Sequence, residues 1–87
     1  MMNFGDAIEN LKIGHRVARS GWNGAGIFLE LQEPDVNSKM THPYIYIDTT
    51  GLKTENPAAP KVRVPWLASQ TDMLADDWFI LQYTDPQ

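Results

Sequence analysis

Apolar side chains recur at helical spacing near the start of the chain. They lie three or four positions apart, as on one face of an amphipathic helix: Phe4, Ala7, Ile8 and Leu11. Asn3 is a residue type that caps a helix N-terminus, Asp6 falls in the first turn, where negative charge is favoured, and Gly14 follows the last apolar position. The pattern therefore predicts a short helix from Phe4 to Ile13.

Alternating apolar and polar residues, or short runs of β-branched and aromatic residues, predict strands in the rest of the chain. These segments are Arg16–Arg19, Ile27–Gln32, Pro43–Asp48, Lys61–Val64 and Trp78–Tyr83. The last segment is the most apolar, and we predict that it lies at the centre of the sheet. The glycine-rich residues from Gly21 to Gly26 predict a wide tip for the first hairpin.

A second helix is predicted between the last two strands, from Gln70 to Ala75. Ser69 precedes Asp72 by three positions, the spacing of a capping box, and the carboxylate lies at the positive end of the helix. Two short helices and about five strands indicate a single α+β ligand-binding domain, residues 1–87, with a small, mostly antiparallel sheet. Loops are predicted where polar residues and prolines gather, at Glu33–His42 and Asn56–Pro60.

Charge and composition exclude several classes of protein. The 87 residues have a formal net charge of −4 and no cysteine, which argues against nonspecific binding to DNA, RNA or an anionic membrane and rules out a disulfide framework. No stretch resembles a signal peptide or a membrane span, so we expect a cytoplasmic protein. Because a domain of this size gains stability from self-association, we also expect a homo-oligomer.

The sequence contains no familiar motif for metal binding or catalysis. His15 and His42 are the only histidines, and neither lies at a metal-site spacing from a carboxylate. We find no nucleophile motif, no Walker loop and no dinucleotide-binding glycine motif. We therefore predict no metal and no cofactor, and we do not expect an enzyme, although a nucleotide hydrolase stays open as an alternative.

Two segments combine tryptophan with polar residues in a way that indicates recognition of a ligand. Pro65–Trp78 has two tryptophans, a serine, a glutamine and three aspartates, and Gly21–Gly26 has Trp22 beside Asn23. Trp22 either stacks on a ligand or folds back over the sheet as a lid on the core. Asn23 either hydrogen-bonds a base or ribose, or belongs to an ordinary Asn-Gly turn.

The residues around the second helix have the same two interpretations. Trp66 precedes the unpaired amides at the helix start, so it either flanks a bound nucleotide or packs beneath the helix. Ser69 serves as the cap in the simpler interpretation. Asp72 completes that cap or accepts hydrogen bonds from a ribose diol, and Gln70 offers an amide at the same end.

The end of this segment is expected to be structural. Asp76 and Asp77 are adjacent and project apart, so we interpret them as solvated or capping residues. Trp78 opens an apolar strand and is predicted to lie in the core with its N–H bonded internally. The best candidates for contacting phosphate are the arginines, whose guanidinium groups are fork-shaped donors: Arg16, Arg19 and Arg63.

Three motifs resemble those of a known protein family. They are Asn3–Ala7 (NFGDA), Gly21–Gly24 (GWNG) and Pro65–Trp78 (PWLASQTDMLADDW). Together they resemble the phage-encoded Thoeris anti-defence proteins of the second type, and the resemblance covers both ends and most of the chain. The segment from Glu33 to Lys61 matches least.

The resemblance implies a non-enzymatic sponge. Family members bind, without degrading it, the cyclic ADP-ribose-type signal (glycocyclic ADP-ribose) made by bacterial TIR-domain proteins, so that the Thoeris effector is not activated. Members form homotetramers with ligand pockets between protomers, and some also bind cyclic oligonucleotide signals. The match places Trp22, Asn23, Trp66, Ser69, Gln70 and Asp72 near the ligand, and Arg63, just outside the matched motif, completes the predicted set.

Two other functions stay open at this point. A protein-binding inhibitor or structural interaction module would turn the same aromatic residues toward a partner protein. A nucleotide hydrolase would bind a similar ligand but release a cleaved product. Ligand binding separates the first of these from a sponge, and the chemical state of the released ligand separates the second.

Overall fold

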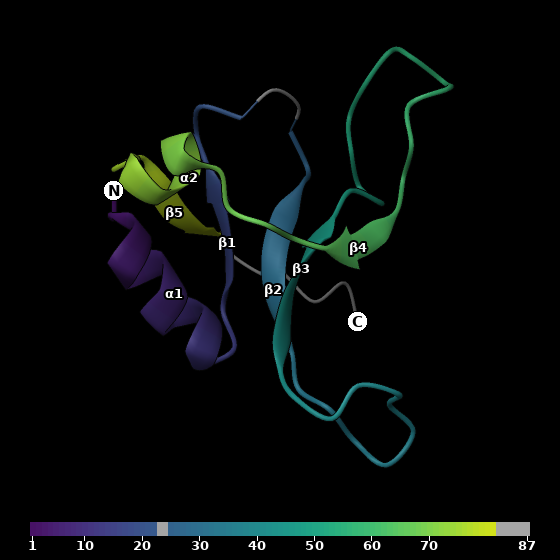
Figure 1. Ribbon diagram of the computed structural model, residues 1–87. Helices are drawn as coiled ribbons and strands as arrows, with labels where there is room; N and C mark the ends of the chain where they lie inside the picture. The colour runs from purple at the N-terminus through teal and green to yellow at the C-terminus, as the bar shows by residue number, and fades with distance from the viewer. Residues whose placement is uncertain (23–24, 82–87) are drawn as a thin grey trace.

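The computed structural model describes residues 1–22 and 25–81 of the chain. Its strands form one antiparallel sheet in the order β4-β3-β2-β1-β5 (Figure 1). The strands are β1 (Arg16–Arg19), β2 (Phe28–Gln32), β3 (Tyr44–Asp48), β4 (Arg63–Pro65) and β5 (Trp78–Leu81). Helices α1 (Phe4–Lys12) and α2 (Gln70–Leu74) lie together beside the β1 and β5 end of the sheet. The predicted α+β class is confirmed.

Helix α1 begins where the sequence predicts and ends one residue earlier. The Asn3 side chain caps it by accepting a hydrogen bond from the Asp6 amide at 2.8 Å. The chain leaves the helix through Gly14, which has a φ of 98° that favours glycine. Ala7 and Leu11 are buried, so this short helix is stabilised by packing one face on the sheet rather than by its own length.

The core lies between α1 and the sheet. Val17 of β1 and Leu29 of β2 are register partners and have no exposed surface, and Trp78 of β5 is equally buried. Ala7 and Leu11 complete this cluster from the helix side. Because side chains alternate along a strand, the neighbours of these residues point to the opposite face of the sheet. That second face is the open one.

Strand β5 forms an edge of the sheet, and the prediction of a central position for it is wrong. Among the described residues β5 pairs along its length only with β1, while β2 occupies the middle. On its outer side Trp78 exchanges two backbone hydrogen bonds with Met2, at 2.8 and 3.1 Å. Of its four residues only Trp78 is buried, and Ile80 is exposed, so the apolar composition of this strand does not depend on how many neighbours it has in the sheet.

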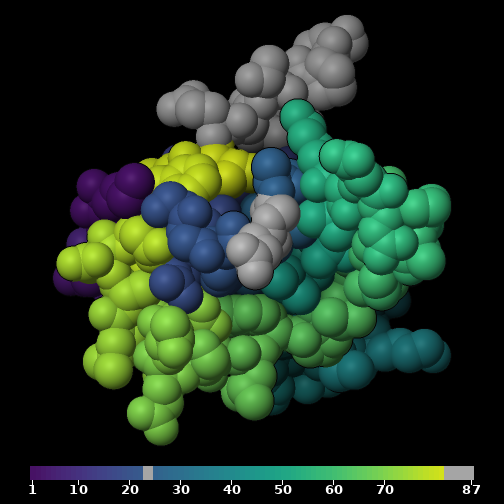
Figure 2. All heavy atoms as spheres, turned by 90° about the horizontal axis from the view of Figure 1, so that it is seen from above, coloured from purple at the N-terminus to yellow at the C-terminus, as the bar shows by residue number. Residues whose placement is uncertain are grey.

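The tip of the β1–β2 connection is fastened to the long β3–β4 loop. The Lys53 amide donates to the Ala25 carbonyl at 2.9 Å. Next to it, Gly26 has a φ of 89°, and a Cβ at this position would lie 2.0 Å from the Gly51 carbonyl oxygen. Only glycine fits so close an approach of two backbones. Figure 2 shows the β3–β4 loop, in green, spread along one side of the molecule.

Candidate functional site

The tryptophans singled out by the sequence gather around the core on the helix side of the sheet. Trp22 and Trp66 each stand edge-on to Trp78, with ring centroids 5.4 and 6.1 Å away, and Phe4 packs against Trp66 and Trp78. We call these four rings the indole cluster. Trp78 is fully buried and its Nε1 donates to the Asp72 carbonyl at 3.1 Å, which confirms its predicted role. Trp22 and Trp66 are half-buried, so part of each indole stays accessible.

Asp72 ties α2 to the indole cluster. Its Oδ2 accepts hydrogen bonds from the Ser69 amide and hydroxyl at 3.1 and 2.8 Å, and the Ser69 hydroxyl accepts from the Asp72 amide, so the predicted capping box is confirmed. Its Oδ1 accepts from Trp22 Nε1 at 3.2 Å and from Arg19 at 2.8 Å. Burial alone would raise the pKa of Asp72, but the hydrogen bonds from Arg19, Trp22 and Ser69 outweigh it and lower that pKa.

Arg19 forms ion pairs with two carboxylates, those of Asp72 and Asp77. It contacts Asp72 through Nη1 and Asp77 through Nε, each at 2.8 Å. Asp77 also accepts a hydrogen bond from the Gly21 amide at 2.8 Å, and the hydrogen bond from Arg19 is the main reason that the pKa of Asp77 is lowered. The prediction of a solvated or capping Asp77 is therefore wrong, because this residue pairs with Arg19. Asp76 is exposed, as expected.

The predicted ligand residues fall in separate places. Those that lie together, in or beside the indole cluster, are Trp22, Trp66, Ser69 and Asp72. Gln70 is the exposed first residue of α2. Arg63 lies in β4 and lines a different cavity. Asn23 lies outside the described residues.

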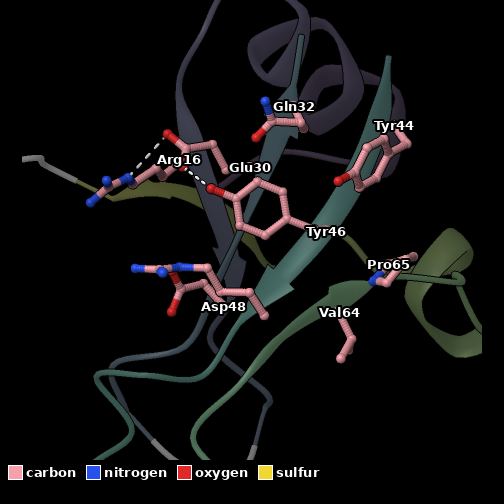
Figure 3. Close-up of a pocket in the computed structure, with 9 residues that line it drawn as sticks. Arg16, Glu30, Gln32, Tyr44, Tyr46, Asp48, Val64 and Pro65 are labelled. Carbon is pink, nitrogen blue, oxygen red and sulfur yellow. Dashed lines mark hydrogen bonds and ion pairs between the residues drawn. The ribbon is translucent and has the colours of Figure 1, made fainter. Parts of the chain in front are cut away.

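A polar cleft of about 310 Å³ opens on the face of the sheet opposite the core. In Figure 3 the side chains of Glu30, Tyr46 and Asp48 project from neighbouring strands on this face. Glu30 and Tyr46 are register partners, as are Asp48 and Arg63. We call this cavity the sheet-face cleft; its lining residues are Arg16, Glu30, Gln32, Tyr44, Tyr46, Asp48, Arg63, Val64 and Pro65.

Glu30 joins side chains from three strands across the cleft. It accepts a hydrogen bond from the Tyr46 hydroxyl, and its other oxygen lies 3.3 Å from Arg16 Nε. The Arg16 guanidinium also stacks over the Phe28 ring, 4.5 Å from its centroid. Burial, followed by the hydrogen bond to Glu30, raises the pKa of Tyr46 to about 12. The phenol is therefore protonated at neutral pH and acts as a donor.

Asp48 is a buried carboxylate beneath an exposed guanidinium group. Its side chain is 4% exposed, whereas that of Arg63 is 64% exposed. Asp48 Oδ2 accepts from Arg63 Nε at 2.8 Å, and Oδ1 accepts from the Thr50 amide and hydroxyl at 2.9 and 2.7 Å. Burial would raise the pKa of Asp48, but the hydrogen bonds from Thr50 and Arg63 outweigh it and lower that pKa. The carboxylate is thus ionised and held in one orientation.

Most lining residues of the sheet-face cleft were not among the residues predicted from the sequence. The signal for them is alternation: in β3, Tyr44, Tyr46 and Asp48 occupy every second position. Ile45 and Ile47 fill the positions between them and face the other side. This spacing predicts a polar face on one strand. Only the pairing of β3 with β2 and β4 shows which other side chains join it.

Residues 1–22 and 25–81 contain neither a metal-binding cluster nor a membrane-spanning helix. No three His, Asp or Glu side chains in these ranges are grouped so that they could hold a metal ion. No helix in the same ranges has the length and apolar character needed to cross a membrane. What both regions described above do offer is paired carboxylates, guanidinium groups and aromatic rings.

Comparison with known proteins gives one consistent result. The profile of the Tad2-like family, described as a Thoeris anti-defense 2-like domain, matches residues 2–81. The chain is also similar to the protein named Thoeris anti-defense 2 from Bacillus phage SP01, with 37% identity over 93 residues that cover 92% of this chain and 94% of that protein. The match therefore includes both the indole cluster and the sheet-face cleft.

Proposed function

This chain belongs to the Tad2-like family of Thoeris anti-defense 2 proteins, and we propose that it is a phage sponge for an immune signal. It binds and sequesters, without degrading it, a cyclic ADP-ribose-type nucleotide of the glycocyclic kind made by TIR-domain proteins in the bacterial cytoplasm. The Thoeris effector then lacks its activator. The observation that supports this most is the similarity to the phage SP01 protein across nearly the whole length of both chains.

The chemistry of the carboxylates supports binding rather than turnover. A general acid or base works best when its pKa lies near the pH of the reaction. In this chain the pKa values of Asp48, Asp72 and Asp77 are all lowered, because each carboxylate accepts hydrogen bonds from an arginine and from other donors. These groups suit the recognition of hydroxyl and amide donors and are poorly suited to proton transfer at neutral pH.

We extend the proposal to a homotetramer with pockets between protomers. The segment around α2 supports it, because large apolar side chains there are not covered within one chain: Leu67 is 91% exposed, Leu74 is 83% and Met73 is 44%. Figure 2 shows the segment from β4 to α2, in light and yellow green, across the lower part of that view. Exposed apolar side chains in a small domain are typical of an assembly interface.

The residues of the indole cluster remain a predicted ligand surface. Trp22 and Trp66 keep accessible area beside α2, and Gln70 is exposed at its start. Asp72 and Ser69 already form a hydrogen bond with each other. In this proposal they therefore contribute more to the shape of the surface than to direct contact with the ligand. Stacking on an indole contributes about 1–3 kcal/mol per base.

A second candidate function is a protein-binding inhibitor or interaction module, which the exposed apolar residues around α2 also favour. Calorimetry against a panel of cyclic ADP-ribose isomers separates the two. The sponge predicts tight, saturable binding of at least one isomer. Absence of heat with every isomer, at a protein concentration where the fold is verified by circular dichroism, would leave the protein-binding function as the better account.

A further inference from the structure

The orientation of Trp22 is set by hydrogen bonds to residues beside the indole cluster. Its indole N–H donates to Asp72 Oδ1 at 3.2 Å, and its backbone amide donates to the Arg19 carbonyl at 3.2 Å. The ring is half-buried and stands edge-on to Trp78. A partly exposed side chain without such contacts would exchange among rotamers. The direction of the accessible indole surface therefore depends on what holds Asp72 and Arg19.

Arg19 holds Asp72 in place from the sheet. Its Nη1 donates at 2.8 Å to Asp72 Oδ1, the same oxygen that accepts the Trp22 indole N–H. Its Nε donates at 2.8 Å to Asp77 Oδ1. Two contacts through different nitrogens fix both the position and the plane of a guanidinium group. The Asp72 oxygen consequently stays where Trp22 can donate to it.

Asp77 fastens the chain immediately before Trp22. Its carbonyl accepts a hydrogen bond from the Ser20 amide at 3.1 Å, and its Oδ2 accepts one from the Gly21 amide at 2.8 Å. The fit depends on the absence of a side chain at Gly21, where a Cβ would lie 2.8 Å from Asp77 Oδ2. Asp77 thus connects the residue before β5 to the backbone that leads into Trp22.

We propose that Arg19 and Asp77 are positioning residues: they hold the Trp22 indole, through Asp72 and the Gly21 backbone, in the orientation in which it stacks on the sequestered nucleotide. This role rests on the proposed function and adds two residues that act without touching the ligand. An aromatic surface that is ordered before the ligand arrives avoids part of the entropic cost of binding.

The test combines two measurements on each variant. One is calorimetry with the cyclic ADP-ribose isomer that the wild type binds most tightly, and the other is heteronuclear NMR of the indole N–H groups. The chain has three tryptophans, and Trp22→Phe identifies the signal of Trp22. Because an indole proton donated to a carboxylate resonates downfield, this signal reports on the bond to Asp72. A loss of stability alone does not move it in a sample that stays folded.

Two variants disturb the contacts of Asp77 without altering Asp72. Asp77→Asn has one acceptor oxygen and gives up either the Gly21 amide or Arg19. It should shift or broaden the Trp22 signal, leave the Trp78 signal in place and weaken binding about 2- to 12-fold, the cost of ordering one released side chain. Gly21→Ala should have the same effects, because its Cβ displaces the Asp77 carboxylate while every charge is retained.

The matched control is Asp76→Asn, the same chemical change at the exposed neighbouring position, which should change affinity less than about 2-fold. Arg19→Lys keeps the charge but has one nitrogen in place of two, so it should resemble Asp77→Asn. In a Trp22→Ala background, Asp77→Asn should weaken binding no further, as expected for a residue that acts through the indole. Circular dichroism at the calorimetry temperature verifies that each variant is folded.

The outcomes separate this role from the proposed function. Weaker binding together with a moved Trp22 signal in Asp77→Asn and Gly21→Ala supports the positioning role. An unchanged Trp22 signal, or a moved signal with wild-type affinity, would overturn that role and leave the sponge intact. A full further loss from Asp77→Asn in the Trp22→Ala background would overturn it as well. If the wild type binds none of the isomers, the proposed function fails and the positioning role fails with it.

Discussion

Replacing Asp72 with asparagine should destabilise the fold, because this carboxylate is surrounded by donors. Oδ1 accepts hydrogen bonds from Arg19 and Trp22, and Oδ2 accepts hydrogen bonds from the Ser69 amide and hydroxyl. An asparagine has one oxygen and one NH₂ group, which is itself a donor. An NH₂ group turned toward Arg19 and Trp22 loses both of their hydrogen bonds, whereas one turned toward Ser69 loses the bond from the Ser69 amide and can donate to the Ser69 hydroxyl.

The expected loss of stability is set by the less costly of the two orientations of the asparagine amide. That orientation turns the NH₂ group toward Ser69: it keeps the hydrogen bonds from Arg19 and Trp22, loses the bond from the Ser69 amide, and leaves Arg19 bonded to a neutral oxygen in place of a carboxylate. A hydrogen bond to a charged partner contributes about 1.5–3 kcal/mol and a neutral one about 1 kcal/mol. The Arg19 and Asp72 side chains are 14% and 13% exposed, which limits the screening of their interaction by solvent. We expect Asp72→Asn to lower the free energy of unfolding by about 2 kcal/mol, about 1 kcal/mol for the lost Ser69 bond and about 1 kcal/mol for the weaker bond to Arg19.

The assay is urea and thermal unfolding at neutral pH and one fixed protein concentration, since assembly would make stability depend on concentration. For a chain of 87 residues, a loss of this size lowers Tm by about 8 to 16 °C. Asp76→Asn is the matched control, because it makes the same chemical change at an exposed position of the same segment and should cost less than about 0.5 kcal/mol. Equal unfolding of Asp72→Asn and the wild type would refute the assigned hydrogen-bond network.

Three further predictions follow from individual contacts. The lowered pKa of Asp48 means that its contribution to stability is present above its ordinary value of 3.8 and is lost as the pH falls through the folded value; urea midpoints should fall below about pH 4, and a flat profile would contradict this. Gly26→Ala, which meets the Gly51 carbonyl, should cost at least about 3 kcal/mol in urea unfolding, against about 1 kcal/mol for Gly14→Ala, whose Cβ meets nothing; equal losses would argue against the close approach. Ultraviolet titration should show one phenol ionising at about pH 12 that disappears in Tyr46→Phe, and loss in this variant of a phenol that ionises at the ordinary value of 10.0 would count against its burial and its hydrogen bond to Glu30.

Much of the fold could be predicted because local signals agree with the final packing. The cap at Asn3, the helical spacing up to Leu11 and the capping box at Ser69 each involve residues close together in sequence. The order of the strands depends on contacts between distant segments. Only Trp78 of β5 is buried, and the apolar character of the strand contains no information about which strands lie on either side.

The candidate site was harder to predict for the same reason. The tryptophans of the conspicuous segments do meet, but they meet in and around the core: Trp22 and Trp66 pack against Trp78, and Asp72 bonds Trp22. The sheet-face cleft is built from single residues on β1, β2, β3 and β4. None of those strands contains a motif of its own, so the cleft becomes visible only when their register is known.

The central claim is that this protein holds an immune signal without consuming it, and recovery of the bound ligand tests that claim most directly. The protein is incubated with an equimolar amount of a cyclic ADP-ribose isomer that it binds, the free fraction is removed by ultrafiltration, and the retained material is heat-denatured and analysed by chromatography with mass spectrometry. A sponge retains nearly all of the ligand and releases it with an unchanged mass and retention time. Release of a linear or otherwise cleaved product, increasing with incubation time, would contradict sequestration and identify a hydrolase.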